Sequence, residues 1–486
     1  MNIETLLDTP AILANQGTPV HLALRFTAPE LESKRTQPIA FCVVLDRSGS
    51  MGGKPLEQAK AACKLVVQNL RKGDRFALIL FDNQAQTLIP LQKIRDKGVA
   101  LRAIDRVGSG GSTNLTGGWM LGRDALKQAP KEMPKKILLL SDGMLNVGIT
   151  DPGQVKQIVA RGLEEHGIRT SCLGFGPDYL EDVLVALADA TGGKFYDANN
   201  PEVLPDVFDA ELEGLQSLTV QNLRIRVKRT TFCESAVLLS DYPAVDLPAF
   251  AQGFGGPGPE DSGSEITVGD LVSEEQRTLV LLLEVLAIPL IEGVPAASLE
   301  GEALLECVFL WDAIQKDQVT SHSEERTIRV LPVQDESEVV RNSEIIPLVA
   351  AQRAGKSVRE ALDRVDSGQV EEAIGGLKDA IRRIEAYGVG SDLTDALNTL
   401  HEALDNLDLE KGYSGLHSRK RLIYRARASA MMSNKDIPSD FYSVVMDPGI
   451  DLEEKVRLLN ELSAPTWVIS EALKQAKRGR RKGGEE

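Results

Sequence analysis

A five-residue apolar run that ends abruptly in polar residues constrains this chain more than any other feature. Residues 41–45 (Phe-Cys-Val-Val-Leu) are apolar throughout, with no alternation between apolar and polar positions. Such a run is typical of a strand buried on both faces, in the middle of a parallel sheet covered by helices. An Asp-x-Ser-x-Ser motif follows at once, with Asp46, Ser48 and Ser50 at its polar positions. Because ligands of open α/β sheets bind beyond the carboxyl ends of the strands, these three side chains are candidate ligands at one point.

Carboxylate and hydroxyl oxygens are hard ligands, which suit a small hard cation such as Mg²⁺ in an octahedral site. Three ligands do not fill an octahedron, and two downstream segments offer more. Gly108–Leu115 is a glycine-rich loop that ends in hydroxyls, with Thr113 as a candidate ligand and Ser112 as its competitor. Lys136–Leu140 is a second buried strand by pattern, and Asp142 follows its end.

Together the three segments resemble the von Willebrand factor type A (VWA) domain, over residues 37–212, and its metal-ion-dependent adhesion site (MIDAS). Residue by residue, the resemblance assigns the metal site to Asp46, Ser48, Ser50, Thr113 and Asp142. It implies that the three hydroxyls contact the metal directly and that the two carboxylates act largely through bound water. The alternative is that the serines merely cap the following helix, since Ser and Asp are favoured caps.

The resemblance also implies a function. The cofactor is expected to be Mg²⁺, with Mn²⁺ or Ca²⁺ as alternatives, and its open coordination position accepts a Glu or Asp carboxylate of a partner protein. The glycine-rich loop permits backbone angles that other residues avoid, so it can shift Thr113 relative to the metal. In adhesive relatives such a shift accompanies movement of the last helix, here Val203–Leu215. We therefore expect partner binding to be reported to the regions beyond Gln216.

The alternation of strands and helices over residues 37–212 predicts an α/β fold with a doubly wound, Rossmann-like, mostly parallel sheet. Residues 216–333 read as strands without intervening helices, which is typical of an antiparallel β-sandwich. The strand predicted at Val20–Thr27 can complete this sandwich, so that the VWA domain is either inserted in it or followed by it. We expect His21 to point outward from that strand, and Asp82 to be a turn residue, with a place near the metal site as the alternative.

A C-terminal helical region follows the sandwich, with helices predicted at Glu338–Ala354 and Ser357–Asp366, and then at Val370–Tyr387 and Leu393–Leu407. The predicted organisation is an N-terminal segment (1–36), the VWA domain (37–212), the sandwich (213–335), a helical domain (336–434) and a partly disordered helical and basic tail (435–486).

Composition narrows the class of protein. The net charge of −16 argues against nucleic-acid binding. No run of about 18 apolar residues predicts a membrane span, and the polar start shows no signal peptide. The five cysteines are widely spaced, which predicts reduced, buried thiols. These features favour a cytoplasmic location.

Catalysis would require a general base, and none of the five histidines lies in the three metal loops. Neither a His-Glu-x-x-His motif nor a phosphate-binding loop is present in the sequence. We therefore expect a metal-dependent protein-interaction module and not an enzyme. The alternatives are a Mg²⁺-dependent hydrolase, or a chaperone or regulatory subunit partnered with an AAA+ ATPase. The domain order is similar to that of bacterial VWA proteins resembling inter-alpha-trypsin inhibitors and calcium-activated chloride channels.

Overall fold

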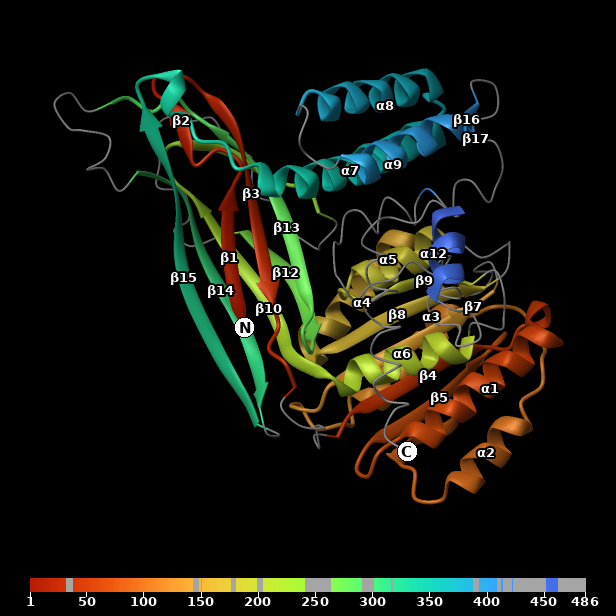
Figure 1. Ribbon diagram of the computed structural model, residues 1–486. Coiled ribbons are helices and arrows are strands. Elements are labelled where there is room, and N and C mark those ends of the chain that lie inside the picture. The colour runs from red at the N-terminus through yellow and green to blue at the C-terminus, as the bar shows by residue number, and fades with distance from the viewer. Residues whose placement is uncertain are drawn as a thin grey trace.

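The computed structural model contains an α/β unit, a β-sandwich and a helical unit, which Figure 1 shows at lower right, left and top. The structure describes residues 1–31, 38–142, 148–149, 151–175, 181–198, 204–240, 264–290, 301–315, 318–387, 393–408, 412–413, 422 and 452–461. Most of the predicted tail at 435–486 lies outside these ranges.

The α/β unit is built on a six-stranded sheet with the motif strand at its centre. In spatial order its strands are β6 (Ala85–Lys93), β5 (Arg75–Phe81), β4 (Ala40–Asp46), β7 (Lys135–Ser141), β8 (Ile168–Phe175) and β9 (Phe195–Ala198). All pairs are parallel except β5 with β6, which is antiparallel. The doubly wound, mostly parallel sheet expected from the sequence is confirmed.

Helices cover both faces of this sheet. One face carries α1 (Lys54–Asn69), α2 (Lys97–Asp105) and α6 (Leu204–Gln216), and the other carries α3 (Leu115–Leu126), α4 (Pro152–His166) and α5 (Glu181–Asp189). Phe41 and Val43 of β4 lie in the first core, whereas Cys42 and Val44 lie in the second. The unbroken apolar run of β4 is thus explained, because both of its faces exclude water.

Two packed sheets form the β-sandwich. One contains β1 (Asn2–Leu7), β3 (Thr18–Thr27), β13 (Gln276–Val285) and β11 (Cys233–Leu238) in that order. The other contains β12 (Ser264–Val272), β10 (Leu218–Arg229), β14 (Glu302–Gln315), β15 (Gln318–Val333) and β2 (Ala11–Leu13). All pairs are antiparallel except β15 with β2. Because β3 pairs with β13, the α/β unit is inserted between two parts of the sandwich (Figure 1).

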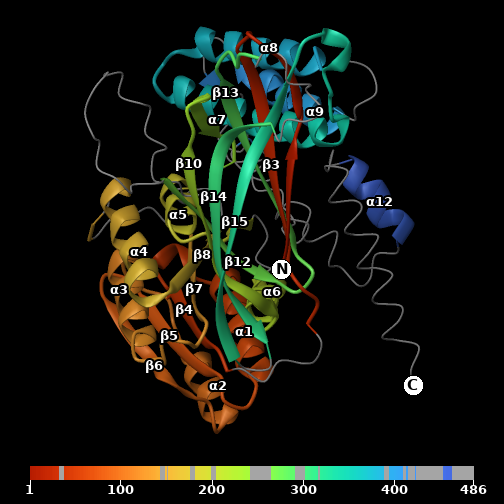
Figure 2. The ribbon, with the colours of Figure 1, turned by 90° about the vertical axis from the view of Figure 1, so that its left-hand side faces the viewer.

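The helical unit comprises α7 (Ile346–Asp366), α8 (Val370–Glu385) and α9 (Thr394–Asp405), which lie over one end of the sandwich (Figure 2); α12 (Leu452–Glu461) is separate. The two helices predicted at 338–354 and 357–366 are wrong, because α7 is a single helix that starts at Ile346. Gly355, which lies between the two predicted helices, is buried within α7. Packing against the sandwich, through Ile345 and Val349, outweighs the low helix propensity of glycine there.

His21 is buried, and the expectation that it points outward is wrong. Its side chain lies between the sandwich and α7, with Nδ1 2.6 Å from Asp8 Oδ2. Arg353 Nε of α7 donates to His21 Nε2 at 3.1 Å. Because Nε2 accepts this hydrogen bond, the ring proton is placed on Nδ1, where it is donated to Asp8. A polar chain therefore crosses the junction of sandwich and helical unit.

All five cysteines are buried free thiols, as predicted. Within the described ranges, no helix combines the length and the apolar character needed to cross a lipid bilayer.

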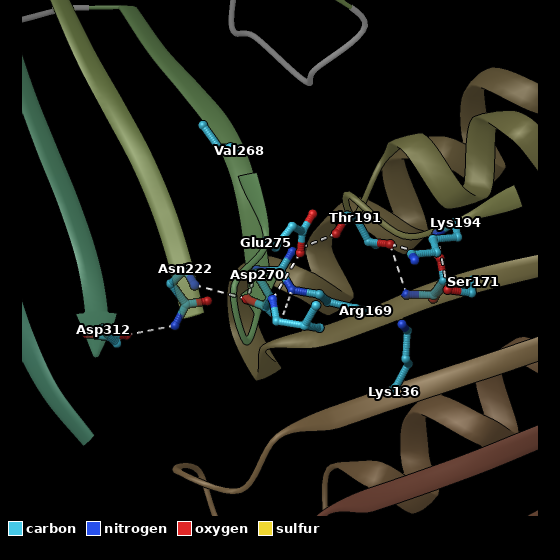
Figure 3. Close-up of polar contacts among 12 residues, drawn as sticks. Lys136, Arg169, Ser171, Thr191, Lys194, Asn222, Val268, Asp270, Glu275 and Asp312 are labelled. Atoms are coloured by element: carbon cyan, nitrogen blue, oxygen red, sulfur yellow. Dashed lines mark hydrogen bonds and ion pairs between the residues drawn. The ribbon is translucent and has the colours of Figure 1, made fainter. Parts of the chain in front are cut away.

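A partly buried ion pair joins the α/β unit to the sandwich. Arg169, near the start of β8, donates from Nη2 to Asp270 Oδ1 of β12 at 2.6 Å, and its Nε also pairs with that carboxylate. Arg169 Nη1 donates to Thr191 O at 2.7 Å, and Asn222 N donates to Asp270 Oδ1 at 3.0 Å. Figure 3 shows Arg169 reaching from the α/β unit toward Asp270 on the neighbouring sheet. The guanidinium and carboxylate form a bidentate pair, which fixes the orientation of the two units.

Asp270→Ala should lower the free energy of unfolding by about 3–5 kcal/mol, because it leaves the Arg169 guanidinium, 7% exposed, without its carboxylate. Urea denaturation followed by tryptophan fluorescence measures this loss. The matched control is Glu306→Ala, whose partner Lys228 is 75% exposed, and its effect should stay within about 0.5 kcal/mol. Equal losses in the two variants would contradict the role assigned to the pair.

Candidate metal centre

The register of the central strands brings the first and third loops together. Leu45 of β4 lies opposite Leu140 of β7 in a parallel pair, so Asp46 and Ser141 follow side by side. Asp142 comes next, at the carboxyl end of β7. Two carboxylates that are 96 positions apart in the sequence therefore meet at one edge of the sheet.

The hydroxyls of the first loop converge on the second carboxylate. Ser50 Oγ donates to Asp142 Oδ1 at 2.9 Å, and Ser48 Oγ lies 3.4 Å from the same oxygen. The two hydroxyl oxygens are 3.2 Å apart. Three of the five predicted site residues thus gather their oxygen atoms around one point.

Asp46 lies beneath this point and is fully buried. Its Oδ1 accepts a hydrogen bond from Ser48 N at 2.8 Å, and its Oδ2 accepts one from Ser141 Oγ at 2.7 Å. Burial raises the pKa of Asp46 to about 6, against the lowering effect of Ser48 and Ser141, and the neighbouring Asp142 charge raises it further. A buried carboxylate with a raised pKa is the kind of group that a bound cation would stabilise in its charged form.

The capping alternative does not account for Ser48. This residue precedes the short 3₁₀ helix Gly49–Met51, but its side chain makes no capping hydrogen bond. The N-cap of α1 is Gly53, so neither serine caps that helix. The hydroxyl of Ser48 points toward Asp142 instead.

The glycine-rich loop packs against the first loop through backbone hydrogen bonds. Gly110 N donates to Arg47 O at 2.8 Å, and Gly49 N donates to Gly111 O at 3.1 Å. Gly111 has a φ of 69°, and a Cβ there would lie 3.1 Å from Asn83 and Asp82. Glycine is required at this position both by the backbone angle and by the close approach.

This loop ends with one exposed and one buried hydroxyl. Ser112 is exposed, whereas Thr113 is 3% exposed. Thr113 is thus enclosed by the protein while Ser112 faces solvent, and this favours Thr113 over Ser112 for a ligand role.

Sequence reasoning missed the residues that hold the loops in place. Arg47 Nη2 donates to Asp82 Oδ2 at 2.6 Å, and Asp82 O accepts from Asn114 N at 2.8 Å. Asp82 Oδ1 also accepts a hydrogen bond from Gln84 N at 3.0 Å, which closes the turn. Asp82 is therefore the expected turn residue, and it also links two of the loops. The role of Ser141 was not predicted either. Its position could have indicated it, because Ser141 lies directly before Asp142 on a strand of the same length as β4.

The donor set is two carboxylates and three hydroxyls. Within the described part of the chain, no group of three or more His, Cys, Asp or Glu side chains is arranged to hold a metal ion. A metal at this edge would therefore depend on the hydroxyls of Ser48, Ser50 and Thr113 as well as the carboxylates. Such an oxygen-only set is compatible with Mg²⁺, which keeps several of its own waters.

Comparison with known proteins agrees with this fold. Residues 41–210 match the family model of the von Willebrand factor type A domain. Uncharacterized protein sll0103 of Synechocystis sp. is 27% identical over 288 residues, covering 57% of this chain and 66% of that protein. Inter-alpha-trypsin inhibitor heavy chain H4 of Bos taurus is 26% identical over 273 residues, covering 51% of this chain and 29% of that protein. These matches span less than two thirds of the relatives' own length.

Solved structures extend the likeness to most of the chain. The von Willebrand factor type A protein from Catenulispora acidiphila has a TM-score of 0.64 at 17% identity, covering 88% of this chain and 96% of that one. The ArnB paralog VWA2 from Sulfolobus acidocaldarius has a TM-score of 0.52 at 16% identity, covering 88% of this chain and 99% of that one. At such identities the likeness concerns the fold alone.

The α/β unit is therefore a VWA domain, of a family that typically mediates metal-dependent protein interactions. The chain is a VWA-domain protein related to inter-alpha-trypsin inhibitor heavy chains and to bacterial VWA proteins, which are usually non-catalytic.

The raised pKa of Asp46 predicts a pH dependence in metal-free protein. Between the ordinary value of 3.8 and about 6, the unfolded state has released this proton while the folded state retains it, so stability falls as pH rises. The shift of about two units corresponds to a loss of about 3 kcal/mol over that range. The measurement is the difference in free energy of unfolding between wild type and Asp46→Asn from pH 4 to pH 7. A difference that is constant with pH would contradict the raised pKa.

Proposed function

We propose that this chain holds a divalent cation, Mg²⁺ in the first place, through Asp46, Ser48, Ser50, Thr113 and Asp142. The observation that carries the proposal is the convergence of Ser48 Oγ and Ser50 Oγ on Asp142 Oδ1, directly above a buried carboxylate. The hydroxyls contact the cation, and Asp46 and Asp142 act mainly through bound water. Mn²⁺ or Ca²⁺ can replace Mg²⁺ in such an oxygen-only set.

The cation in turn binds a carboxylate of a partner protein. Because its direct protein ligands are neutral hydroxyls and the two carboxylates act mainly through water, the cation retains attraction for an outside anion. Mg²⁺ keeps several waters in protein sites, and a Glu or Asp side chain of the partner can replace one of them. The function proposed is non-catalytic, metal-dependent capture of an acidic segment of another protein.

Thr113→Val should weaken Mg²⁺ binding by about tenfold or more, because it removes one oxygen from the proposed ligand set. The matched control is Ser112→Ala, which removes the neighbouring, exposed hydroxyl and should leave the affinity unchanged. Isothermal titration calorimetry with MgCl₂ measures both. If Ser112→Ala weakens binding and Thr113→Val does not, then Ser112, and not Thr113, is the metal ligand.

The last helix of the VWA domain is placed to report binding to the sandwich. Helix α6 ends at Gln216, and β10 begins at Leu218. Gln216 Nε2 donates to Asp74 Oδ2 at 3.2 Å, and the buried Glu211 accepts from Tyr196 Oη at 2.6 Å and pairs with Lys136 Nζ at 2.6 Å. Any movement of α6 must break these contacts. We propose that they set the resting position of α6, which superposed structures with and without a bound carboxylate would test.

The cytoplasm is the proposed location, which the five buried free thiols support, since such thiols suit a reducing compartment. Recovery of the native protein from an extracellular or periplasmic fraction would contradict this.

Capture of the partner should require both the cation and Asp46. Immobilised protein should retain its partner in Mg²⁺ and release it in chelator, and Asp46→Ala should retain nothing, because the metal bridge is lost. Mass spectrometry of the eluates identifies the partner. Replacing the Glu or Asp of the partner that contacts the cation should then abolish retention. A partner that is retained equally in Mg²⁺ and in chelator would show that the metal is not the contact.

A further inference from the structure

A second candidate site lies far from the metal loops, where the helical unit meets the sandwich. It is a cavity of about 300 Å³ between strands β11 and β13 and helices α7 and α8. Its lining includes the apolar side chains of Leu239, Leu282 and Ile384. The volume is at the lower end of the range for small-molecule sites, which are typically apolar with a few charged groups at fixed positions.

The rim of this cavity is basic, although the whole chain carries a net charge of −16. Four cationic side chains line it, and they are Arg353, Lys356, Arg364 and Arg383. The acidic residues that line it are Glu360 and Asp379, and Asp379 is already paired with Arg382, which lies outside the lining. Within the lining residues that the structure describes, one unpaired carboxylate therefore accompanies four cations.

The four cationic side chains differ in whether they already make hydrogen bonds. Arg353 donates to His21, and Arg364 Nη1 donates to the backbone carbonyl of Glu372 at 3.2 Å. Neither of these partners, an imidazole ring and a backbone carbonyl, carries a negative charge. Among the described residues, Lys356 and Arg383 have no hydrogen bond or ion pair. Lys356 is half-buried and Arg383 is exposed, so both can reach an anion without first breaking a contact.

A glycine in the lining makes room for one of these cations. Gly376 lies within α8, where glycine costs about 1 kcal/mol relative to alanine. It lines the cavity, and a Cβ at this position would lie 2.6 Å from Arg364 Nη1. The missing side chain leaves room for the Arg364 guanidinium to lie across α8. A helix-destabilising residue that makes room for a cation beside the cavity is consistent with ligand binding.

We propose that this cavity binds a small molecule that carries a phosphate monoester and a short apolar portion. Lys356 and Arg383 bind the phosphate, Arg364 and Arg353 add positive charge, and the apolar portion lies on Leu282 and its neighbours. Arginine forks match the geometry of phosphate oxygens, and the charge excess on the rim suits a dianion better than a carboxylate. This site does not depend on the metal centre.

Isothermal titration calorimetry of the full chain in chelator, with phenyl phosphate as the probe, tests the proposal. Phenyl phosphate should bind more tightly than inorganic phosphate, which lacks the apolar portion, and more tightly than benzoate, which lacks the second charge. Arg383→Gln and Lys356→Gln should each weaken binding by about tenfold, the loss expected for one charge-assisted hydrogen bond. Gly376→Leu should weaken binding because its side chain displaces the Arg364 guanidinium from its place beside the cavity.

Two further variants separate binding from folding. Lys378→Gln removes the same charge from an exposed position of α8 outside the lining, and it should change the affinity by less than about twofold. Glu360→Gln should tighten binding by about threefold, because it removes the one unpaired carboxylate that faces the anion, and a folding defect does not produce a gain. The proposal is overturned if phenyl phosphate gives no heat at about 10 mM, or if Gly376→Leu and Arg383→Gln bind it as wild type does.

Discussion

The architecture of the candidate metal centre depends on one buried carboxylate, that of Asp46. It sits where two parallel strands end in register, and it accepts hydrogen bonds from Ser48 N and from Ser141 Oγ. The first of these bonds folds the motif loop back on itself, and the second joins it to the neighbouring strand. Burial alone would favour the protonated form of this group, so the fold holds in place a charge that water does not stabilise.

The surrounding loops are held by contacts that run through the end of β5. Arg47 reaches Asp82, and the glycine-rich loop is fastened to the first loop and to Asn83. The same pattern of buried polar links recurs at the junctions between units. Arg169 with Asp270 joins the VWA domain to the sandwich, and His21 with Arg353 joins the sandwich to α7. The three units are thus connected by specific polar contacts as well as by apolar packing, which is what any coupling between them would require.

The sequence was most informative where burial is uniform. The apolar runs of β4 and β7, and the polar residues directly after them, indicated both the central sheet and the clustering of Ser48, Ser50 and Asp142. The sequence was less informative where tertiary contacts determine which element forms. No local pattern predicted α2 or β6, which is an edge strand that contains Pro90 and is largely exposed. The apolar spacing predicted two helices where packing against the sandwich holds α7 as one, and nothing in the sequence near His21 indicates its distant partner Arg353. A local sequence pattern does not indicate a contact between residues that lie more than 300 positions apart.

The most direct test of the account is a crystal structure of the protein grown in Mn²⁺, with anomalous diffraction data collected at the manganese edge. The account predicts one anomalous peak within about 2.3 Å of the hydroxyl oxygens of Ser48, Ser50 and Thr113, with Asp46 and Asp142 bound to it directly or through water. A map with no peak between these loops, in crystals that contain Mn²⁺ at millimolar concentration, would contradict it.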